Sequence, residues 1–282
     1  MIFVTTGGRK DLSGADHAKL LVENGFNAIE VSSGKYEEFQ LDKLKHLKNY
    51  ASISLHNYYP PPKAGFVFNL ASNNKEVAEC SMRLVENALQ WSSELGSKYY
   101  SFHAGFLLDP SVDELGKKVL YRKLIDRNLA MQLFLDRVNL LAEKARILGI
   151  ELLIENNVLS VSNFNEFKQN PFLVATPDEA VYIMQNTPQN VNLLVDVAHL
   201  YVSSKTLNFE PGTYFEMCNK WISGYHLSDN DGTADKNEPI NDKSWFWQYL
   251  KPGLDVYTVE VYNTELDVLH EQYGLVESFI GG

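Results

Sequence analysis

Six residues of the types that bind metal ions or transfer protons each close a short apolar run in this chain. They are His56, His103, Glu155, Asp196, His226 and Glu260. Imidazole nitrogens and carboxylate oxygens are donors that divalent cations take from proteins, and the same groups serve as general acids and bases. Their recurrence at equivalent places predicts a metal site with acid–base chemistry beside it.

The three carboxylates need partners, because an unpaired buried charge is costly. Salt bridges to Lys or Arg would serve as well as a cation, but the stretches around them contain neither residue: Ile154-Glu-Asn-Asn157, Val195-Asp-Val-Ala-His199 and Val259-Glu-Val-Tyr262. A single histidine at a strand end is more often a hydrogen-bonded core residue, whereas several of them together with carboxylates favour a metal. The remaining histidines are expected to be solvated on helical surfaces: His17, His46 and His270.

The elements that position these residues are predicted to be buried parallel strands. The runs are Ser52–His56, Tyr99–His103, Glu151–Glu155, Asn192–Asp196, Ile222–His226 and Val256–Glu260, preceded by Ile2–Thr5 and Asn27–Val31. Helical patterns alternate with them, which predicts a single-domain α/β protein, a (β/α)8 TIM barrel over residues 1–282. The carboxyl ends of such strands converge on one face. A doubly wound sheet is the alternative, but it would not bring six strand ends to one switch point.

Residues that typically cap or end helices predict several helices and loops. Ser13 and Gly25 bound one helix, and residues 74–95 form another that Gly96 ends. The helical pattern from Pro110 to Leu148 is long enough for two helices. Residues 156–174 exceed a usual βα loop and predict a lid, and Thr176-Pro-Asp-Glu179 predicts a capping box.

Composition excludes several classes of function. Only 2 cysteines are present, so a disulfide framework and a cysteine zinc cluster are excluded. No apolar run reaches the roughly 18 residues of a membrane span, and the expected location is the cytoplasm. The net charge of −11 disfavours nucleic acid as a partner. The sequence leaves open whether the chain forms a homo-oligomer.

An ordered set of motifs carries a family resemblance. The motifs are His56-Asn-Tyr-Tyr59, Asn69-Leu-Ala-Ser72, Phe102-His-Ala-Gly105, Ile154-Glu-Asn156, Asp196-Val-Ala-His199, His226-Leu-Ser-Asp229 and Glu260. With its strand order, the chain resembles the xylose isomerase-like barrel superfamily, which includes sugar and sugar-phosphate isomerases, ketose epimerases and endonuclease IV. The resemblance covers nearly the whole chain.

The resemblance implies a ligand set. In the isomerase and epimerase members one divalent metal is held by residues that match Glu155, Asp196, His226 and Glu260. Mn²⁺, Mg²⁺ and Zn²⁺ all suit this donor set. In the endonuclease members, residues matching His56 and His103 hold a second metal with Glu155 as a bridge.

A third metal of the endonucleases uses a residue matching His199 and an Asp-x-His triplet. Here the triplet is Asp235-Lys236-Asn237, without the second histidine. Asparagine is a poor substitute for imidazole on zinc, which argues against a phosphodiesterase.

The leading hypothesis is a metal-dependent isomerase or epimerase of a sugar or sugar phosphate that transfers a proton next to a carbonyl group, with Glu155 and Glu260 as the catalytic pair. The alternatives are an endonuclease IV-like zinc hydrolase of abasic DNA and a non-catalytic metal- or sugar-binding barrel. His56, His103, His199 and Asp235 are candidates for a second metal or for the substrate.

Further substrate contacts are expected from the loops. Tyr59, beside Tyr58, is a candidate wall against a sugar, and Asn157 is a second candidate contact; packing within a loop is the alternative for the tyrosines. Lys236 and the segment Thr5-Thr-Gly-Gly-Arg9-Lys10 are candidates for phosphate, although a Gly-Gly pair is more often a simple turn.

Overall fold

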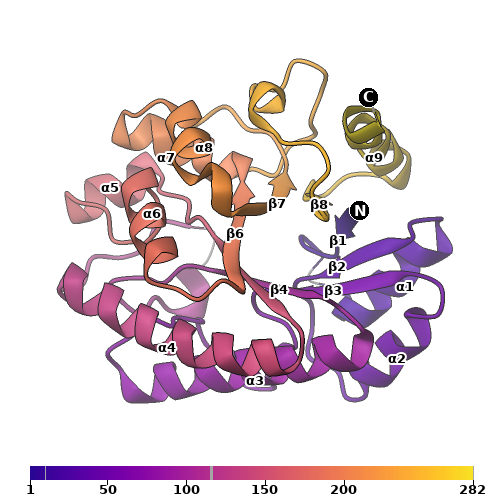
Figure 1. Cartoon of the computed structure of the whole chain (residues 1–282), viewed down its shortest axis with the longest axis horizontal. Coiled ribbons are helices and arrows are strands. Elements are labelled where there is room, and N and C mark those ends of the chain that lie inside the picture. Colours follow the sequence, from indigo (N-terminus) through magenta and orange to yellow (C-terminus); the bar gives the residue numbers. More distant parts are fainter. Residues whose placement is uncertain (10, 115–116, 282) are drawn as a thin grey trace.

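The strands form the barrel that the sequence predicts. The computed structural model describes residues 1–9, 11–114 and 117–281, and within these residues eight parallel strands close into a barrel in chain order (Figure 1). They are β1 (Ile2–Thr5), β2 (Ala28–Val31), β3 (Ser52–His56), β4 (Tyr99–His103), β5 (Glu151–Glu155), β6 (Val191–Asp196), β7 (Ile222–Leu227) and β8 (Val256–Val259). The single α/β barrel is therefore confirmed, with strand ends within about a residue of those expected.

The strand register decides which side chains meet. His103 pairs with Glu155 across β4 and β5, and Asp196 pairs with His226 across β6 and β7. Side chains alternate along a strand, so residues two positions earlier point into the barrel as well. Inside the barrel, below the strand ends, an apolar layer fills the interior; it consists of Phe3, Ala28, Leu153, Leu194 and Val256. This layer lies below the carboxyl ends of the strands, so the polar residues gather above it at one mouth of the barrel.

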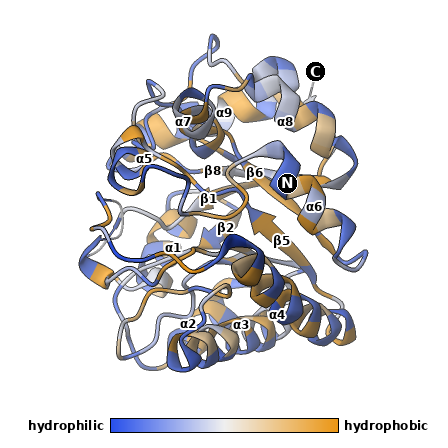
Figure 2. Ribbon diagram, turned by 90° about the vertical axis from the view of Figure 1, so that its left-hand side faces the viewer, coloured by the Kyte–Doolittle hydropathy of each residue, from blue (hydrophilic) through white to orange (hydrophobic). Residues whose placement is uncertain are grey.

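Helices surround the barrel. They are α1 (Gly14–Glu23), α2 (Gln40–Leu47), α3 (Lys75–Leu95), α4 (Arg127–Ile147), α5 (Val161–Phe167), α6 (Pro177–Gln185), α7 (Val197–Leu207), α8 (Pro211–Cys218) and α9 (Leu266–Gly281). Helices α3 and α4 lie side by side along one flank (Figure 1). Both carry hydrophobic and hydrophilic residues (Figure 2), as expected of helices with one face on the core. Over the described stretches, no helix is long and apolar enough to cross a membrane.

Two predicted helix boundaries are confirmed by their caps. The Ser13 side chain accepts a hydrogen bond from the Asp16 N–H at the start of α1. At α3, Asn74 caps the first turn and Gly96 ends the helix with φ +78°. A left-handed residue is cheap only for glycine, and this explains why the helix stops there.

Between residues 110 and 148, a stretch long enough for two helices, the described residues form one α-helix. They contain only α4 as an α-helix, preceded by a 3₁₀ turn at Val112–Glu114; residues 115 and 116 lie outside the description. The Glu114 carboxylate accepts from the N–H groups of Ser111 and Leu120 and pairs with Arg122. The bond to the Ser111 N–H is the kind that begins a helix, and a 3₁₀ turn does begin there. The bond to the Leu120 N–H takes a donor that a continuing helix would use, so the helix does not extend through that residue.

Residues 156–174, where the sequence predicts a lid, are not a plain loop. They contain α5, and Leu159, Phe167 and Phe172 are buried in a separate small hydrophobic cluster. The capping box at α6 is also wrong: the Thr176 side chain makes no cap hydrogen bond with the described residues. Glu179 instead accepts from the Val174 N–H and pairs with Arg127.

His17 is another correction. Its side chain is 8% exposed, and its Nδ1 lies 3.0 Å from the carbonyl oxygen of Thr6. The helical pattern placed it on the surface, but this part of α1 packs against the loop after β1. His46 and His270 are exposed, as expected.

Candidate metal centre

Four side chains converge at the mouth of the barrel. Glu155, Asp196 and His226 end or nearly end β5, β6 and β7, and Glu260 follows β8 directly; one ligand atom from each lies within 4.8 Å of the others. Nδ1 of His226 lies 2.7 Å from Oε2 of Glu260 and 3.4 Å from Oε1 of Glu155. Glu155, Asp196 and His226 have no exposed surface, and Glu260 is 6% exposed.

A second group shares Glu155. Nε2 of His56 lies 3.3 Å from Oε2 of Glu155, and Nε2 of His103 lies 3.5 Å from the same oxygen. Nδ1 of His56 is 2.9 Å from the hydroxyl of Ser101, which orients the ring. Since Oε1 of Glu155 faces His226 and Oε2 faces the other two histidines, this carboxylate joins the two groups.

His199 and Asp235 lie at the side of Asp196. Nε2 of His199 is 3.2 Å from Asp235 and 3.7 Å from Asp196, and the His199 N–H donates to Asp196 at the start of α7. Asn237 occupies the place where the endonuclease pattern requires a histidine; it is 7% exposed, and its carbonyl accepts from the Tyr262 N–H.

Glu30 belongs to the site and was not among the predicted site residues. It is 1% exposed, and its Oε1 lies 3.1 Å from Nε2 of His226; the Thr258 hydroxyl donates to its other oxygen at 3.3 Å. The sequence feature that points to Glu30 as a site residue is its charge within the apolar run Ala28-Ile-Glu-Val31. The strand-end pattern does not select this residue, because Glu30 lies one residue before the end of β2.

The electrostatics of the cluster follow from its burial. Burial alone would raise the pKa of Glu260, but the imidazoles around it, first His226, outweigh this effect and lower that pKa to about 2. Burial and the neighbouring carboxylates raise the pKa of Asp196 well above its usual value, although His199 opposes this. The pKa of His226 is also raised, because Glu30, Glu260 and Glu155 outweigh the opposing effect of burial. The positive charges of protonated imidazoles thus partly balance the negative charges of the neighbouring carboxylates.

The donor set fits a divalent cation. Among the described residues, both oxygens of Glu155, Oδ2 of Asp196 and Nδ1 of His226 are buried without a hydrogen-bond partner. Buried polar atoms normally have a hydrogen-bond partner. Buried oxygen and nitrogen atoms that lack one and face one another therefore suit the coordination of a metal ion. Three carboxylates and one imidazole suit Mn²⁺, Mg²⁺ or Zn²⁺.

The structure does not bring Tyr59, Asn157 or Lys236 into this cluster. Tyr59 is fully buried and donates to Gln40 at 2.6 Å. Asn157 is 3% exposed and donates to the carbonyls of three residues, Ala104, Gly105 and Leu173. Lys236 pairs with Asp231 at 2.5 Å. Tyr59 thus packs within the fold, and Asn157 holds neighbouring loops together by hydrogen bonds.

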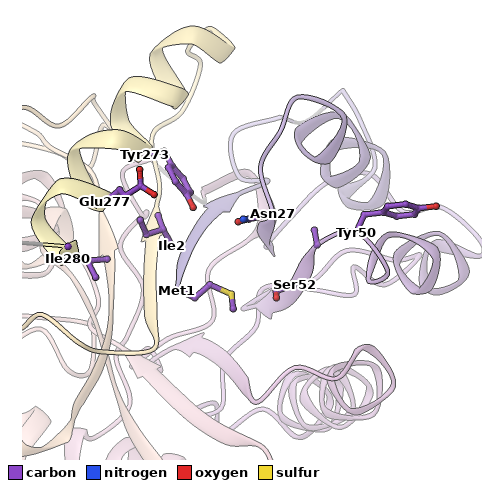
Figure 3. Close-up of a pocket in the computed structure, with 10 residues that line it drawn as sticks. Met1, Ile2, Asn27, Tyr50, Ser52, Tyr273, Glu277 and Ile280 are labelled. Carbon is purple, nitrogen blue, oxygen red and sulfur yellow. The ribbon is translucent and has the colours of Figure 1, made fainter.

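A pocket of about 590 Å³ lies at the opposite end of the barrel (Figure 3). It is lined by residues at the beginnings of strands and by α9, among them Ile2, Ser52 and Tyr273. None of the site residues described above contributes to it, so it does not bear on the chemistry at the mouth.

Comparisons with known proteins agree with this architecture. The profile of a family described as xylose isomerase-like TIM barrel matches residues 18–261. The structure of a D-tagatose 3-epimerase-like protein superposes with a TM-score of 0.73 at 17% identity, covering 99% of this chain and 97% of the other. A D-psicose 3-epimerase from Clostridium cellulolyticum, determined with D-tagatose, gives 0.66 at 12% identity and covers 99% and 98%. A protein from Thermus thermophilus, soaked with ZnCl2, gives 0.65 at 20% identity and covers 98% of each chain. No curated protein sequence matches.

Proposed function

Because the chain belongs to the family of xylose isomerase-like TIM barrels, we propose that it is a sugar isomerase or epimerase that depends on a divalent cation. The observation that carries this proposal is the buried cluster of Glu155, Asp196, His226 and Glu260, with ligand atoms within 4.8 Å of one another. The similar structures of a D-tagatose 3-epimerase-like protein and of a D-psicose 3-epimerase support a ketose as the substrate class.

The proposed reaction moves a proton on a carbon next to a carbonyl group. When bound, a divalent ion would act as a Lewis acid on the carbonyl and hydroxyl oxygens of the substrate. Glu155 and Glu260 reach the mouth from β5 and from beyond β8, and the pKa of each carboxyl is held below its usual value despite burial, by the nearby histidines. Both are therefore carboxylates at neutral pH, and we assign to them the removal and return of the proton.

His103 has the most open side chain of the histidines in the cluster, with 25% of it exposed. Burial, as the largest cause, lowers its pKa to about 4, so the imidazole is neutral at pH 7. A neutral imidazole both donates and accepts hydrogen bonds, which suits it to hold a sugar hydroxyl. We assign this role to His103, while His226 and Asp196 hold the ion.

The charges at the mouth favour a neutral sugar over a sugar phosphate. Five carboxylates lie in or beside the cluster: Glu30, Glu155, Asp196, Asp235 and Glu260. Two cations predicted to bind phosphate have other partners, since Arg9 pairs with Asp11 at 2.8 Å and Lys236 pairs with Asp231. Lys10 lies outside the described residues. A doubly charged phosphate would meet mainly repulsion here.

One observation favours a second candidate, a zinc phosphodiesterase. His56 and His103 meet Oε2 of Glu155, which is a ligand group for a second ion. Asn237 in place of histidine and the net charge of −11 argue against it.

Metal content per chain separates the two candidates. Elemental analysis should find one divalent ion per chain in the wild type and a loss in Glu260→Gln, and the loaded wild type should convert a member of a ketose panel that includes D-tagatose and D-psicose. Two or three zinc ions per chain together with incision of abasic DNA would replace the epimerase proposal by the phosphodiesterase. A wild type that binds no divalent cation would refute both.

A further inference from the structure

Tyr262 lies two residues beyond Glu260, donates a hydrogen bond to it, and is held by two other parts of the chain, the loops after β1 and β7. We propose that Tyr262 is a positioning residue whose phenol fixes one oxygen of Glu260, so that the other oxygen faces the cation site. The inference rests on the proposed function, because it assigns Tyr262 a role toward an ion that Glu260 would hold.

The first support is the hydrogen bond itself. The Tyr262 hydroxyl donates to Oε1 of Glu260 at 2.6 Å, whereas Oε2 of Glu260 lies 2.7 Å from Nδ1 of His226. The two oxygens of one carboxylate therefore have different neighbours. Rotation about the last torsion of a glutamate is soft, so a bond to one oxygen selects which oxygen faces the cluster. A neutral phenol donates this bond and leaves the carboxylate charge available.

The second support is the close packing of the Tyr262 ring on the loop after β1. A Cβ atom on Gly7 would lie 2.3 Å from the Tyr262 hydroxyl oxygen, and one on Gly8 would lie 2.8 Å from the Cγ of the ring. Any side chain at either position would displace the ring. This contact, together with the left-handed φ of +80° at Gly8, explains the Gly7-Gly8 pair, which the sequence alone left between a phosphate loop and a simple turn.

The third support comes from the loop after β7. The Tyr262 N–H donates to the carbonyl oxygen of Asn237 at 3.0 Å, and Asn237 itself is buried. The segment that would supply a metal-binding histidine in an endonuclease here holds the backbone of Tyr262. The loop after β1 thus holds the ring of Tyr262, and the loop after β7 holds its backbone. Together they place the hydroxyl oxygen beside Glu260.

The test uses Tyr262→Phe, which keeps the ring and removes only the hydroxyl. Loss of an outer partner of a metal ligand typically weakens metal binding by about 10–100-fold. We expect a weakening in this range for Mn²⁺, measured by calorimetry, and a changed visible spectrum of the Co²⁺-loaded protein. With a ketose that the wild type converts, kcat should fall while KM changes little.

Tyr99→Phe is the matched control. Its hydroxyl also donates to a carboxylate at 2.6 Å, that of Asp255, but at the start of β4 and therefore at the far end of the barrel. This control should leave Mn²⁺ affinity and the Co²⁺ spectrum unchanged.

Gly7→Ala provides a second route, because the added methyl group would lie 2.3 Å from the Tyr262 hydroxyl oxygen and 2.4 Å from a ring carbon, and so displaces the ring together with its hydroxyl. It should weaken Mn²⁺ binding in the wild type. In a Tyr262→Phe background the ring is still displaced, which lowers stability, but Mn²⁺ affinity should fall little further because no hydroxyl bond to Glu260 is left to lose. Gly274→Ala is its control, because a Cβ atom there meets nothing within 4 Å. If Tyr262→Phe does not fold, the Mn²⁺ affinities of Gly7→Ala and Gly274→Ala test the inference: equal affinities would overturn it.

The outcomes separate this inference from the proposed function. Equal Mn²⁺ affinity and equal Co²⁺ spectra for the wild type and a folded Tyr262→Phe would overturn the inference and leave the proposed function standing. Absence of cation binding by the wild type would overturn both.

Discussion

The carboxylate of Glu30 and the imidazole of His226 form a buried pair, with Oε1 of Glu30 3.1 Å from Nε2 of His226. A carboxylate beside one ring nitrogen favours the proton on that nitrogen and leaves the other as a lone-pair donor. The other nitrogen, Nδ1, is the one that faces Glu155 and Glu260. Glu30 on β2 therefore decides which atom of a β7 side chain is offered to a cation.

Replacement of Glu30 by Gln should weaken divalent cation binding by about 10-fold or more, because the neutral amide no longer fixes the His226 tautomer. The change preserves side-chain shape, so the cooperative unfolding transition should remain. Calorimetric titration with Mn²⁺ measures the affinity, and nitrogen chemical shifts of the labelled imidazole report the tautomer.

Glu151→Gln is the matched control for this substitution. Glu151 lies at the opposite end of β5 and accepts from the Asn192 side chain at 3.2 Å, away from the cluster. Equal losses of Mn²⁺ affinity in the two variants would refute the role assigned to Glu30.

Replacement of Glu155 or Glu260 by Gln should abolish turnover, since each variant removes a carboxylate that binds the ion and transfers a proton. General acid–base catalysis alone contributes about 10²–10⁴-fold. The assay follows interconversion of a ketose and uptake of solvent deuterium at the reacting carbon. Retained activity in both variants would refute the mechanism, and Glu151→Gln again serves as the control.

The stability of the metal-free protein should fall as pH rises above about 6.5. The pKa values of His226 and His199 are raised in the fold, because neighbouring carboxylates outweigh burial. A raised pKa means that the folded state binds the proton more tightly than the unfolded chain, whose histidine pKa is about 6.5. The stability gained from these protons is complete below that pH and is lost as pH rises through the folded values.

Melting temperatures of chelator-treated protein between pH 6 and 9 test this expectation. Addition of Mn²⁺ should remove the decline, because the cation takes the place of the protons and binds better as pH rises. A melting temperature of the metal-free protein that increases over the range would contradict the assignment of charge to the imidazoles.

The barrel, and the meeting of histidines and carboxylates at one end of its strands, could be predicted because both depend on local patterns. Short apolar runs that end in Glu155 or Asp196 predict strands, and parallel strands necessarily bring their carboxyl ends together. The structure then shows the register, in which His103 lies beside Glu155.

Contacts between residues far apart in the sequence could not be predicted in this way. Glu30 meets His226 across 196 positions of sequence, and no local pattern links them. The same holds for His17, which looks solvated on a helical wheel but is covered by the loop that contains Thr6. Tyr59 looked like a loop aromatic at the mouth, but its hydroxyl turns outward to Gln40 of α2. Side-chain direction in loops depends on neighbours that only the folded chain supplies.

A phosphorylated sugar should be a poor ligand compared with the same sugar without phosphate. The cluster contributes several carboxylates, one bound divalent ion would neutralise only two of those charges, and Arg9 and Lys236 are paired with Asp11 and Asp231. Inorganic phosphate at millimolar concentration should therefore leave turnover of a free ketose unchanged, and the 1-phosphate of that ketose should show a lower kcat/KM. Asp231→Asn removes the closer of the two carboxylates that pair with Lys236 and leaves only Glu238, at 4.0 Å. It should therefore narrow the difference in kcat/KM between the two ketoses, because the Lys236 charge is less neutralised. Competitive inhibition by phosphate in the wild type, or a preference for the phosphorylated ketose, would show that cations other than Arg9 and Lys236 reach the substrate.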